Sequence, residues 1–315
     1  MDLIIRNILG WCLASLLIWL GYVKRAKLRA LAGEFILSIY FHNPTVKEFE
    51  SCIRWLIKSK FRFLSLGDVE ELIKTNKMVP AGCALITIDD GWALNRQVVV
   101  EIAHKYRIPV GIFISTGPVE EGTFWWSYVD EANRLGLASF RKNDLKKLKN
   151  EERLETIKKL KKEIQLPREA LTVEQVKEIA KSPFITIGSH TLTHPILVTC
   201  NYQQVHDELY LSKEKLQKWL SKEVKYFAYP NGTYAEREIN MIQKANYSLA
   251  FTTVPDYLRT STLKRRFELP RFEVCPNRTF AETICRITGV WQPCLVRLSA
   301  AFRLRKRASF WEDKK

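Results

Sequence analysis

The chain has 315 residues, 46% of them hydrophobic and 27% charged, a composition that excludes a wholly disordered or fibrous protein. Its formal net charge of +16 suits a nucleic acid or an anionic membrane as partner. The basic excess lies at the ends: residues 1–32 and 259–315 hold 19 basic and 6 acidic residues, whereas residues 33–258 hold 31 basic and 28 acidic. The nearly neutral middle argues against a nucleic-acid-binding surface.

The N-terminal region contains an apolar segment. Residues 8–23 carry no charge, and extension to Leu3 adds only Arg6, so the segment has the length of a membrane span. Four basic residues follow it, at Lys24, Arg25, Lys27 and Arg29. We predict a membrane anchor with a basic flank over residues 1–32 and prefer an uncleaved span to a cleaved signal peptide or a surface-lying helix. The basic flank favours a cytoplasmic main domain.

Short apolar runs alternate with amphipathic stretches through the middle of the chain. Strands are expected over residues 36–41, 84–88, 110–114, 184–187, 224–228 and 249–252. Helices are expected over residues 46–60, 98–106, 205–220 and 236–245, and over 125–135, 143–164 and 172–180 within a helical insertion at about 120–181. The alternation predicts a mostly parallel sheet, either open or closed into a barrel.

The C-terminal segment, residues 281–315, mixes apolar residues with many arginines. It is typical either of a basic amphipathic helix on an anionic membrane or of a closing helix with a solvated tail. The chain has seven cysteines, none in a C-x-x-C spacing, so neither a zinc–thiolate site nor a disulfide framework is expected and a reducing compartment is favoured.

Polar clusters follow two of the expected strands. Asp89 and Asp90 come directly after the second strand, and His190 and His194 follow the fourth. The carboxyl ends of parallel strands are where α/β folds place their active sites. Adjacent carboxylates point in different directions, so one can bind a metal ion while the other handles a proton. Two histidines at i and i+4 converge on one cation if the segment turns helically, and one carboxylate completes a three-ligand set.

A third polar segment, Phe227–Gly232, ends the fifth expected strand. Its proline and glycine shape a tight loop that can offer backbone N–H groups to an oxyanion. Taken alone, the segment is equally typical of a plain turn at the end of a strand. As a functional loop, its candidate substrate-binding residues are Tyr229, Pro230 and Asn231.

Together these motifs resemble those of the NodB-like polysaccharide deacetylases, carbohydrate esterases that remove N-acetyl groups from amino sugars. Thr87–Gly91 is similar to the family's T-F-D-D-G, with Ile88 in place of Phe. His190–His194 matches H-[ST]-x-x-H, and Phe227–Gly232 matches the [FS]-x-Y-P-x-G form of the third motif. The resemblance covers about residues 34–275 and implies an α/β fold, a distorted (β/α) barrel of the polysaccharide deacetylase type.

The resemblance also implies roles for the motif residues. Asp90, His190 and His194 would hold a divalent cation, usually zinc in the family, and Asp89 would be the general base that deprotonates the attacking water. The backbone N–H of Asn231 would help to stabilise the tetrahedral oxyanion.

Two departures from the family pattern concern the partners of this site. The Arg of the alternative third motif, which holds the catalytic Asp, is missing, and Arg271 is the expected substitute because members with the Tyr-Pro-x-Gly loop commonly carry an Arg there. The family's general acid is a His near the C-terminus, but this chain has no His after His206. We assign His42, directly after the first strand, as the candidate acid and expect His206 to face solvent.

These observations predict three parts: a membrane anchor over residues 1–32, a polysaccharide deacetylase domain over 33–280 and a basic amphipathic tail over 281–315. The expected function is metal-dependent removal of N-acetyl groups from an amino sugar in a polysaccharide or a lipid-linked glycan at a membrane. Two alternatives stay open. One is a deformylase or O-deacetylase that uses the same site; the other is a catalytically weak, membrane-tethered scaffold of polysaccharide assembly, which the missing C-terminal His motivates.

Overall fold

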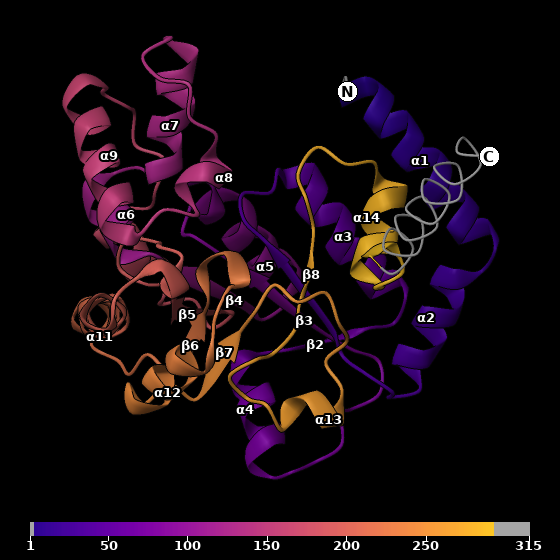
Figure 1. Cartoon of the computed structure of the whole chain (residues 1–315). Helices are drawn as coiled ribbons and strands as arrows, with labels where there is room; N and C mark the ends of the chain where they lie inside the picture. Colours follow the sequence, from indigo (N-terminus) through magenta and orange to yellow (C-terminus); the bar gives the residue numbers. More distant parts are fainter. Residues whose placement is uncertain (1–2, 293–315) are drawn as a thin grey trace, which may run out of the picture.

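An eight-stranded parallel sheet forms the centre of the molecule in the computed structural model, which describes residues 3–292 (Figure 1). The strands are β1 Leu37–Phe41, β2 Arg62–Leu64, β3 Cys83–Ile88, β4 Val110–Ile114, β5 Ile185–Ser189, β6 Tyr226–Ala228, β7 Leu249–Phe251 and β8 Phe272–Glu273. Their order is β7-β6-β5-β4-β3-β1-β8, and β2 pairs with β3. Every strand pairing is parallel, which confirms the sheet expected from the alternation of strands and helices.

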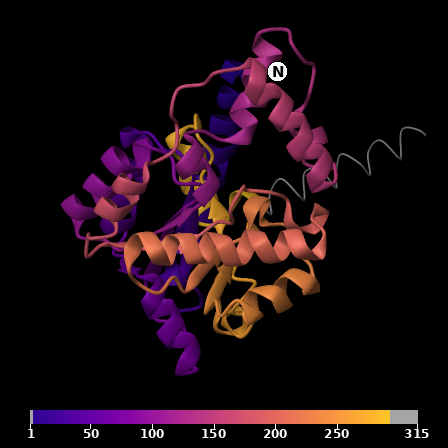
Figure 2. The same ribbon diagram turned by 90° about the vertical axis from the view of Figure 1, so that its left-hand side faces the viewer.

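Helices connect the strands and cover the outside of the sheet. They are α3 Val46–Lys58, α4 Leu66–Lys74, α5 Glu101–Tyr106, α11 Tyr202–Leu220, α12 Glu236–Lys244 and α13 Thr260–Leu263, with a π-helical turn, Arg96–Val100, before α5. Figure 2 shows α11 crossing the outside of the sheet below the helical insertion. Its start is fixed by a capping box, in which the side chains of Asn201 and Gln204 each accept the other's backbone N–H. Such reciprocal caps satisfy N–H groups that have no partner inside the helix.

The helical insertion lies between β4 and β5. It consists of α6 Thr116–Glu121, α7 Trp125–Arg134, α8 Lys142–Leu145, α9 Asn150–Glu163 and α10 Val173–Ile179. The single helix expected over residues 143–164 is wrong, because non-helical residues 146–149 separate α8 from α9. The break accompanies a tertiary contact that the sequence pattern does not show: Arg153 at the start of α9 is buried and reaches the loop at His194.

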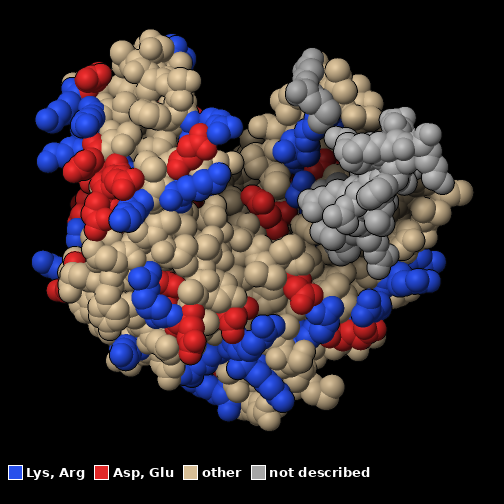
Figure 3. Space-filling view, in the orientation of Figure 1, with Lys and Arg blue, Asp and Glu red and all other residues tan. Residues whose placement is uncertain are grey.

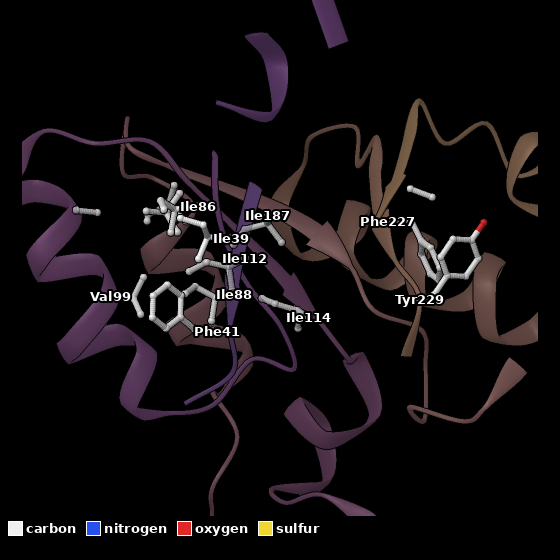
Figure 4. Close-up of a cluster of buried hydrophobic side chains, with 14 of the residues drawn as sticks. Ile39, Phe41, Ile86, Ile88, Val99, Ile112, Ile114, Ile187, Phe227 and Tyr229 are labelled. Carbon is white, nitrogen blue, oxygen red and sulfur yellow. The ribbon is translucent and has the colours of Figure 1, made fainter. Parts of the chain in front are cut away.

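Side chains alternate between the two faces of the sheet, as the pleat of a strand requires. Ile39, Ile86 and Ile112 lie on the face that packs against the surrounding helices (Figure 4). Leu85 and Phe113 belong to a second buried cluster on the opposite face. Because the direction alternates along β3 and into the residues that follow it, Thr87 and Asp89 share the face of Leu85.

The segment before β8 closes the gap between the two edges of the sheet. Leu269 makes a parallel bridge with Phe251 of β7, and β8 pairs with β1. The strands therefore form a distorted barrel, as the resemblance implied. Arg271 lies between the bridge and β8 and is completely buried, with its guanidinium carbon 4.4 Å from the centre of the Tyr40 ring and 5.6 Å from that of Phe113.

The N-terminal apolar segment forms two helices, α1 Leu3–Trp19 and α2 Tyr22–Leu31, bent by 60°. The bend contains Gly21 with φ of 78°, a backbone conformation that glycine adopts without strain. Among residues 3–292, no single helix combines the length and hydropathy needed to cross a membrane, and α1 and α2 meet both requirements only as a bent pair.

Helix α1 packs on the barrel domain through α14, Phe280–Ile287. Ala14 and Leu17 form a buried cluster with Ile284 and Cys285 of α14. The described part of the predicted C-terminal tail thus includes a helix that contacts both α1 and β8, while residues 293–315 lie outside the described residues.

Candidate active site

Asp90, His190 and His194 meet where β3 and β5 end. The Nε2 atoms of His190 and His194 lie 3.5 Å and 3.3 Å from Asp90 Oδ1. One ligand atom from each residue lies within 4.8 Å of the other two, and all three residues are buried. Residues separated by a hundred positions in the sequence therefore form one compact set of two nitrogens and one oxygen.

The loop that carries the two histidines is not helical, yet both rings face Asp90. Thr191 and His194 instead adopt left-handed backbone conformations, with φ of 70° and 55°. Glu208 of α11 holds the loop, because its Oε2 accepts the backbone N–H of Thr193 and of the preceding residue at 2.8 Å each. Left-handed non-glycine residues cost about 1–3 kcal/mol each and cluster at functional sites.

The hydrogen bonds around this cluster leave its facing atoms available to a cation. His190 Nδ1 donates to the carbonyl oxygen of Ala228 at 2.7 Å, so its Nε2 keeps a free lone pair. Burial lowers the pKa of His194 to about 4, which keeps that ring neutral near pH 7. Trp92 Nε1 donates to Asp90 Oδ2 at 2.9 Å, whereas Asp90 Oδ1 is buried without a hydrogen-bond partner among the described residues.

A buried carboxylate oxygen without a partner is costly, and a divalent cation would satisfy it. Two imidazoles and one carboxylate are a ligand set that zinc and other divalent metals accept, with positions left open for water and substrate. The residues present therefore fit a catalytic metal.

Asp89 forms a buried, bidentate ion pair beside this cluster. Arg271 donates from Nη1 to Asp89 Oδ1 and from Nη2 to Asp89 Oδ2, both at 2.8 Å. The guanidinium also donates to Thr87 Oγ1 at 2.9 Å and to the carbonyl oxygen of Thr252 at 3.1 Å. Burial alone would raise the pKa of the Asp89 carboxyl, but the charge and hydrogen bonds of Arg271 outweigh it, and the pKa is lowered. Asp89 is thus a carboxylate held in one orientation.

An open cavity of about 650 Å³ is lined by Asp89 and by the three residues of the Asp90 cluster. His42 lines it, with Nδ1 3.9 Å from Glu273 Oε1 on β8 and its ring 5.4 Å from that of Tyr40. The structure therefore places His42 on the same rim as Asp89. His206 lies elsewhere, on α11, with its ring stacked on Tyr210 and its side chain 45% exposed.

The third motif forms a tight turn after β6. Asn231 lines the cavity with φ of 57°, and a Cβ at Gly232 would lie 2.5 Å from the backbone nitrogen of Thr253, so the turn requires glycine there. Pro230 is buried at the start of the turn. The Tyr229 ring is buried in the core beside Tyr234, 4.8 Å away, so of the three residues expected to bind substrate only Asn231 lines the described cavity.

Several residues around the site were not predicted from the sequence. Trp92, Glu208 and Arg153 contact the ligand residues or their loop. Only Trp92 left a sequence signal, since it follows Asp90 by two positions. Arg153 lies in a charged run of the helical insertion that resembles a solvated helix face, yet it is 2% exposed. Its guanidinium and the indole N–H of Trp125 both donate to the carbonyl oxygen of His194, at 3.4 Å and 3.1 Å.

The sequence matches a known family. The family pattern described as polysaccharide deacetylase matches residues 76–250. The Bacillus subtilis (strain 168) protein named "Putative polysaccharide deacetylase YxkH" is 25% identical over 259 residues, which are 82% of this chain and 75% of that protein.

Solved structures share the fold. The Streptococcus pyogenes deacetylase PplD, solved in complex with acetate, has a TM-score of 0.59 at 19% identity and covers 81% of this chain and 98% of its own. IcaB from Ammonifex degensii has a TM-score of 0.60 at 18% identity, with 82% and 98% covered.

Proposed function

The chain belongs to the polysaccharide deacetylase family and is a deacetylase hydrolase, and from this premise we propose that it removes N-acetyl groups from an amino sugar in a polysaccharide or a lipid-linked glycan. The observation that carries the proposal is that one open cavity is lined by the Asp90–His190–His194 cluster and by Asp89, which is paired with the buried Arg271. Such a pairing supplies a cation site and a fixed base for amide hydrolysis.

Asp90, His190 and His194 would hold the divalent cation, zinc being the metal usual in the family. When bound, the cation acidifies water and polarises the acyl carbonyl. His190 is oriented for this role by the carbonyl of Ala228, and Trp92 orients the carboxylate of Asp90 through Oδ2. Neighbours that fix the orientation of ligands commonly affect metal affinity 10- to 100-fold.

Asp89 is the proposed general base. Each of its oxygens accepts one N–H of Arg271, and a carboxylate oxygen keeps a second lone pair for the proton of the attacking water. Arg271 acts as a positioning residue, because it stabilises the ionised form of Asp89 and prevents its rotation. The proton taken by Asp89 comes from the water whose oxygen forms the new bond to the acyl carbon.

The remaining steps concern the oxyanion and the leaving amine. We assign the backbone N–H of Asn231 to the oxyanion, because the turn after β6 brings this residue to the cavity. His42 is the proposed proton donor to the sugar nitrogen, since it lines the same cavity and Glu273 lies 3.9 Å from its ring. Breakage of the C–N bond then releases acetate and leaves a free amine on the sugar.

The test is acetate release by the full-length protein loaded with zinc or cobalt. Chito-oligosaccharides and a lipid-linked N-acetylhexosamine are the substrates, with N-formyl and O-acetyl analogues to define the acyl group. Asp89→Asn is expected to abolish release while stoichiometric metal binding persists. The matched control is Asp207→Asn, which changes a half-exposed carboxylate on α11 that does not line the cavity. Metal binding by the wild type without release from any of these substrates would contradict the proposal and support the scaffold alternative.

We also propose that α1 and α2 associate with a membrane. Trp11 and Trp19 are 55% and 80% exposed, and the basic residues of α2 adjoin this apolar surface. Carbonate extraction tests the mode of association: retention in the membrane pellet is expected of an inserted bent pair, whereas complete release would reject insertion.

A further inference from the structure

Two lysines of the helical insertion line the catalytic cavity. Lys142 begins α8 and Lys146 follows its end, and both side chains border the cavity that contains Asp90 and His194. A spacing of four residues places side chains on one face of a helical turn. Figure 3 shows basic side chains over α8 beside the hollow between the helical insertion and the rest of the molecule.

The two lysines differ in their partners. Lys142 Nζ forms an ion pair with Asp130 Oδ2 at 2.5 Å. Lys146 Nζ donates to Asn231 Oδ1 at 2.9 Å, which is a neutral amide, and no carboxylate among residues 3–292 lies within 4.0 Å of it. Burial lowers the pKa of Lys146, as expected of a cation that is partly withdrawn from water without a counter-charge.

The other charges of the cavity are accounted for by close partners. Asp89 is paired with Arg271, and Asp90 faces the two histidine ligands. Glu273 lies beside His42, and both Asp90 and Glu273 act on Lys146 only at longer range. The wall formed by the helical insertion therefore presents positive charge that the chain itself does not neutralise by contact.

We propose that Lys146, supported by Lys142, binds an anionic group of the glycan, a phosphate or a carboxylate, next to the sugar that is deacetylated. The inference rests on the proposed function and names the substrate class as an anionic N-acetylated glycan. Lys146 has two further N–H donors beyond the one used by Asn231, and a charge-assisted hydrogen bond from a partly buried ammonium is stronger than a neutral one. Asn231 joins this subsite to the candidate oxyanion turn.

The experiment compares three probes with the full-length, metal-loaded protein: neutral chitotetraose, the same tetramer with a phosphate at its reducing end, and a tetrasaccharide that alternates N-acetylglucosamine with glucuronate. The expected kcat/KM is at least about tenfold higher for an anionic probe than for the neutral one, as one charge-assisted hydrogen bond provides. The probe with the higher value identifies phosphate or carboxylate as the preferred group. Lys146→Met is expected to bring the ratio close to one, and Lys146→Arg to retain part of it.

Lys147→Met is the matched control, because Lys147 is exposed and does not line the described cavity. Equal kcat/KM values for the three probes in the wild type would overturn the inference. So would Lys146→Met if it lowered all three values by the same factor, which is the result expected if Lys146 only supports the Asn231 turn. Failure of the proposed function gives a different result, because no probe would then release acetate. In that case calorimetry would measure the affinity of the wild type and of Lys146→Met for the same three probes. Tighter binding of an anionic probe by the wild type, lost in Lys146→Met, would still support the inference, and equal affinities would overturn it.

Discussion

Arg271 is a full positive charge inside a barrel, and its surroundings explain how it is tolerated. Two of its nitrogens pair with Asp89, a third donates to a backbone carbonyl, and its guanidinium carbon lies 4.4 Å from the Tyr40 ring centre. Only a planar guanidinium offers this set of donors, since an ammonium cannot pair with both carboxylate oxygens in one plane. We infer that the geometry, more than the charge, is what the site requires of this residue.

We expect Arg271→Lys to lower kcat about 10- to 100-fold with a small change in KM, because Asp89 would stay ionised but lose its fixed orientation. Arg271→Met should cost more, and it should also lower the free energy of unfolding by about 3–5 kcal/mol because Asp89 would be left buried and unpaired. Steady-state kinetics and denaturant unfolding measure the two effects. Wild-type kcat in Arg271→Lys would argue against orientation as the role of this residue.

The carbonyl of His194 receives two donors from the helical insertion, Trp125 and Arg153. We expect Trp125→Phe, which keeps an aromatic ring but removes the N–H, to weaken zinc binding, within the 10- to 100-fold range typical of residues that orient metal ligands. Competition with a chromogenic chelator measures the affinity without reference to turnover. Trp126→Phe serves as the control, since Trp126 contacts His194 through a ring–ring contact and not through its indole N–H. Equal zinc affinities in the two variants would contradict a role for the indole N–H of Trp125.

The sequence predicted which side chains at the strand ends lie together, while their catalytic and metal-binding roles stay predictions. Asp89, Asp90, His190 and His194 were placed correctly near one another because the carboxyl ends of parallel strands meet at one edge. Glu208, Arg153 and Lys146 were missed, since each acts on a residue distant in the sequence, 85 positions away for Lys146 and Asn231. No local pattern indicates which charged residue of a polar helix is buried.

At the scale of elements, the contact between α1 and α14 combines an apolar cluster with one buried carboxylate. Glu282 is completely buried and lies 2.8 Å from both Arg6 of α1 and Arg286 of α14. Gly10 allows this approach, because a Cβ there would lie 2.7 Å from Glu282 Oε2. The sequence indicated an apolar N-terminal helix but not this contact, since Arg6 in isolation was compatible with the edge of a membrane span.

We expect Glu282→Gln to lower the free energy of unfolding by about 2 kcal/mol, less than for a fully buried pair because the arginines remain partly solvated. Glu34→Gln is the matched control: Glu34 pairs with Arg29, but both side chains are nearly half exposed, and a change below about 0.5 kcal/mol is expected. Denaturant unfolding of both variants in the same buffer measures the difference. Similar values would show that α1 is not held by this ion pair.

At the scale of the whole molecule, the charge distribution separates two surfaces. The cavity combines a fixed carboxylate, a candidate cation site and the lysines of the helical insertion, whereas α1 and α2 present apolar and basic residues on another part of the molecule. The sequence-based division into a nearly neutral middle and basic ends gave only the net charge of each segment, not the positions of individual charges on the surface. It did not distinguish Lys146 from the solvated lysines around it, because net charge is insensitive to which side chains face a cavity.

The exposed apolar residues of α1 and the basic residues of α2 lead to a prediction about lipid composition. We expect the full-length protein to sediment with vesicles that contain anionic lipid more strongly than with neutral vesicles, because Lys24 and Arg25 are exposed and each basic residue near an anionic surface contributes about 1 kcal/mol. High salt should reduce the difference by screening.

Replacing Trp11 and Trp19 together by alanine should weaken binding to both kinds of vesicle, whereas Phe140→Ala, a change of an exposed aromatic of the helical insertion, should leave binding unchanged. Binding that is equal for both lipids and insensitive to salt would reject an electrostatic contribution, and binding unaffected by the tryptophan changes would place the contact away from α1.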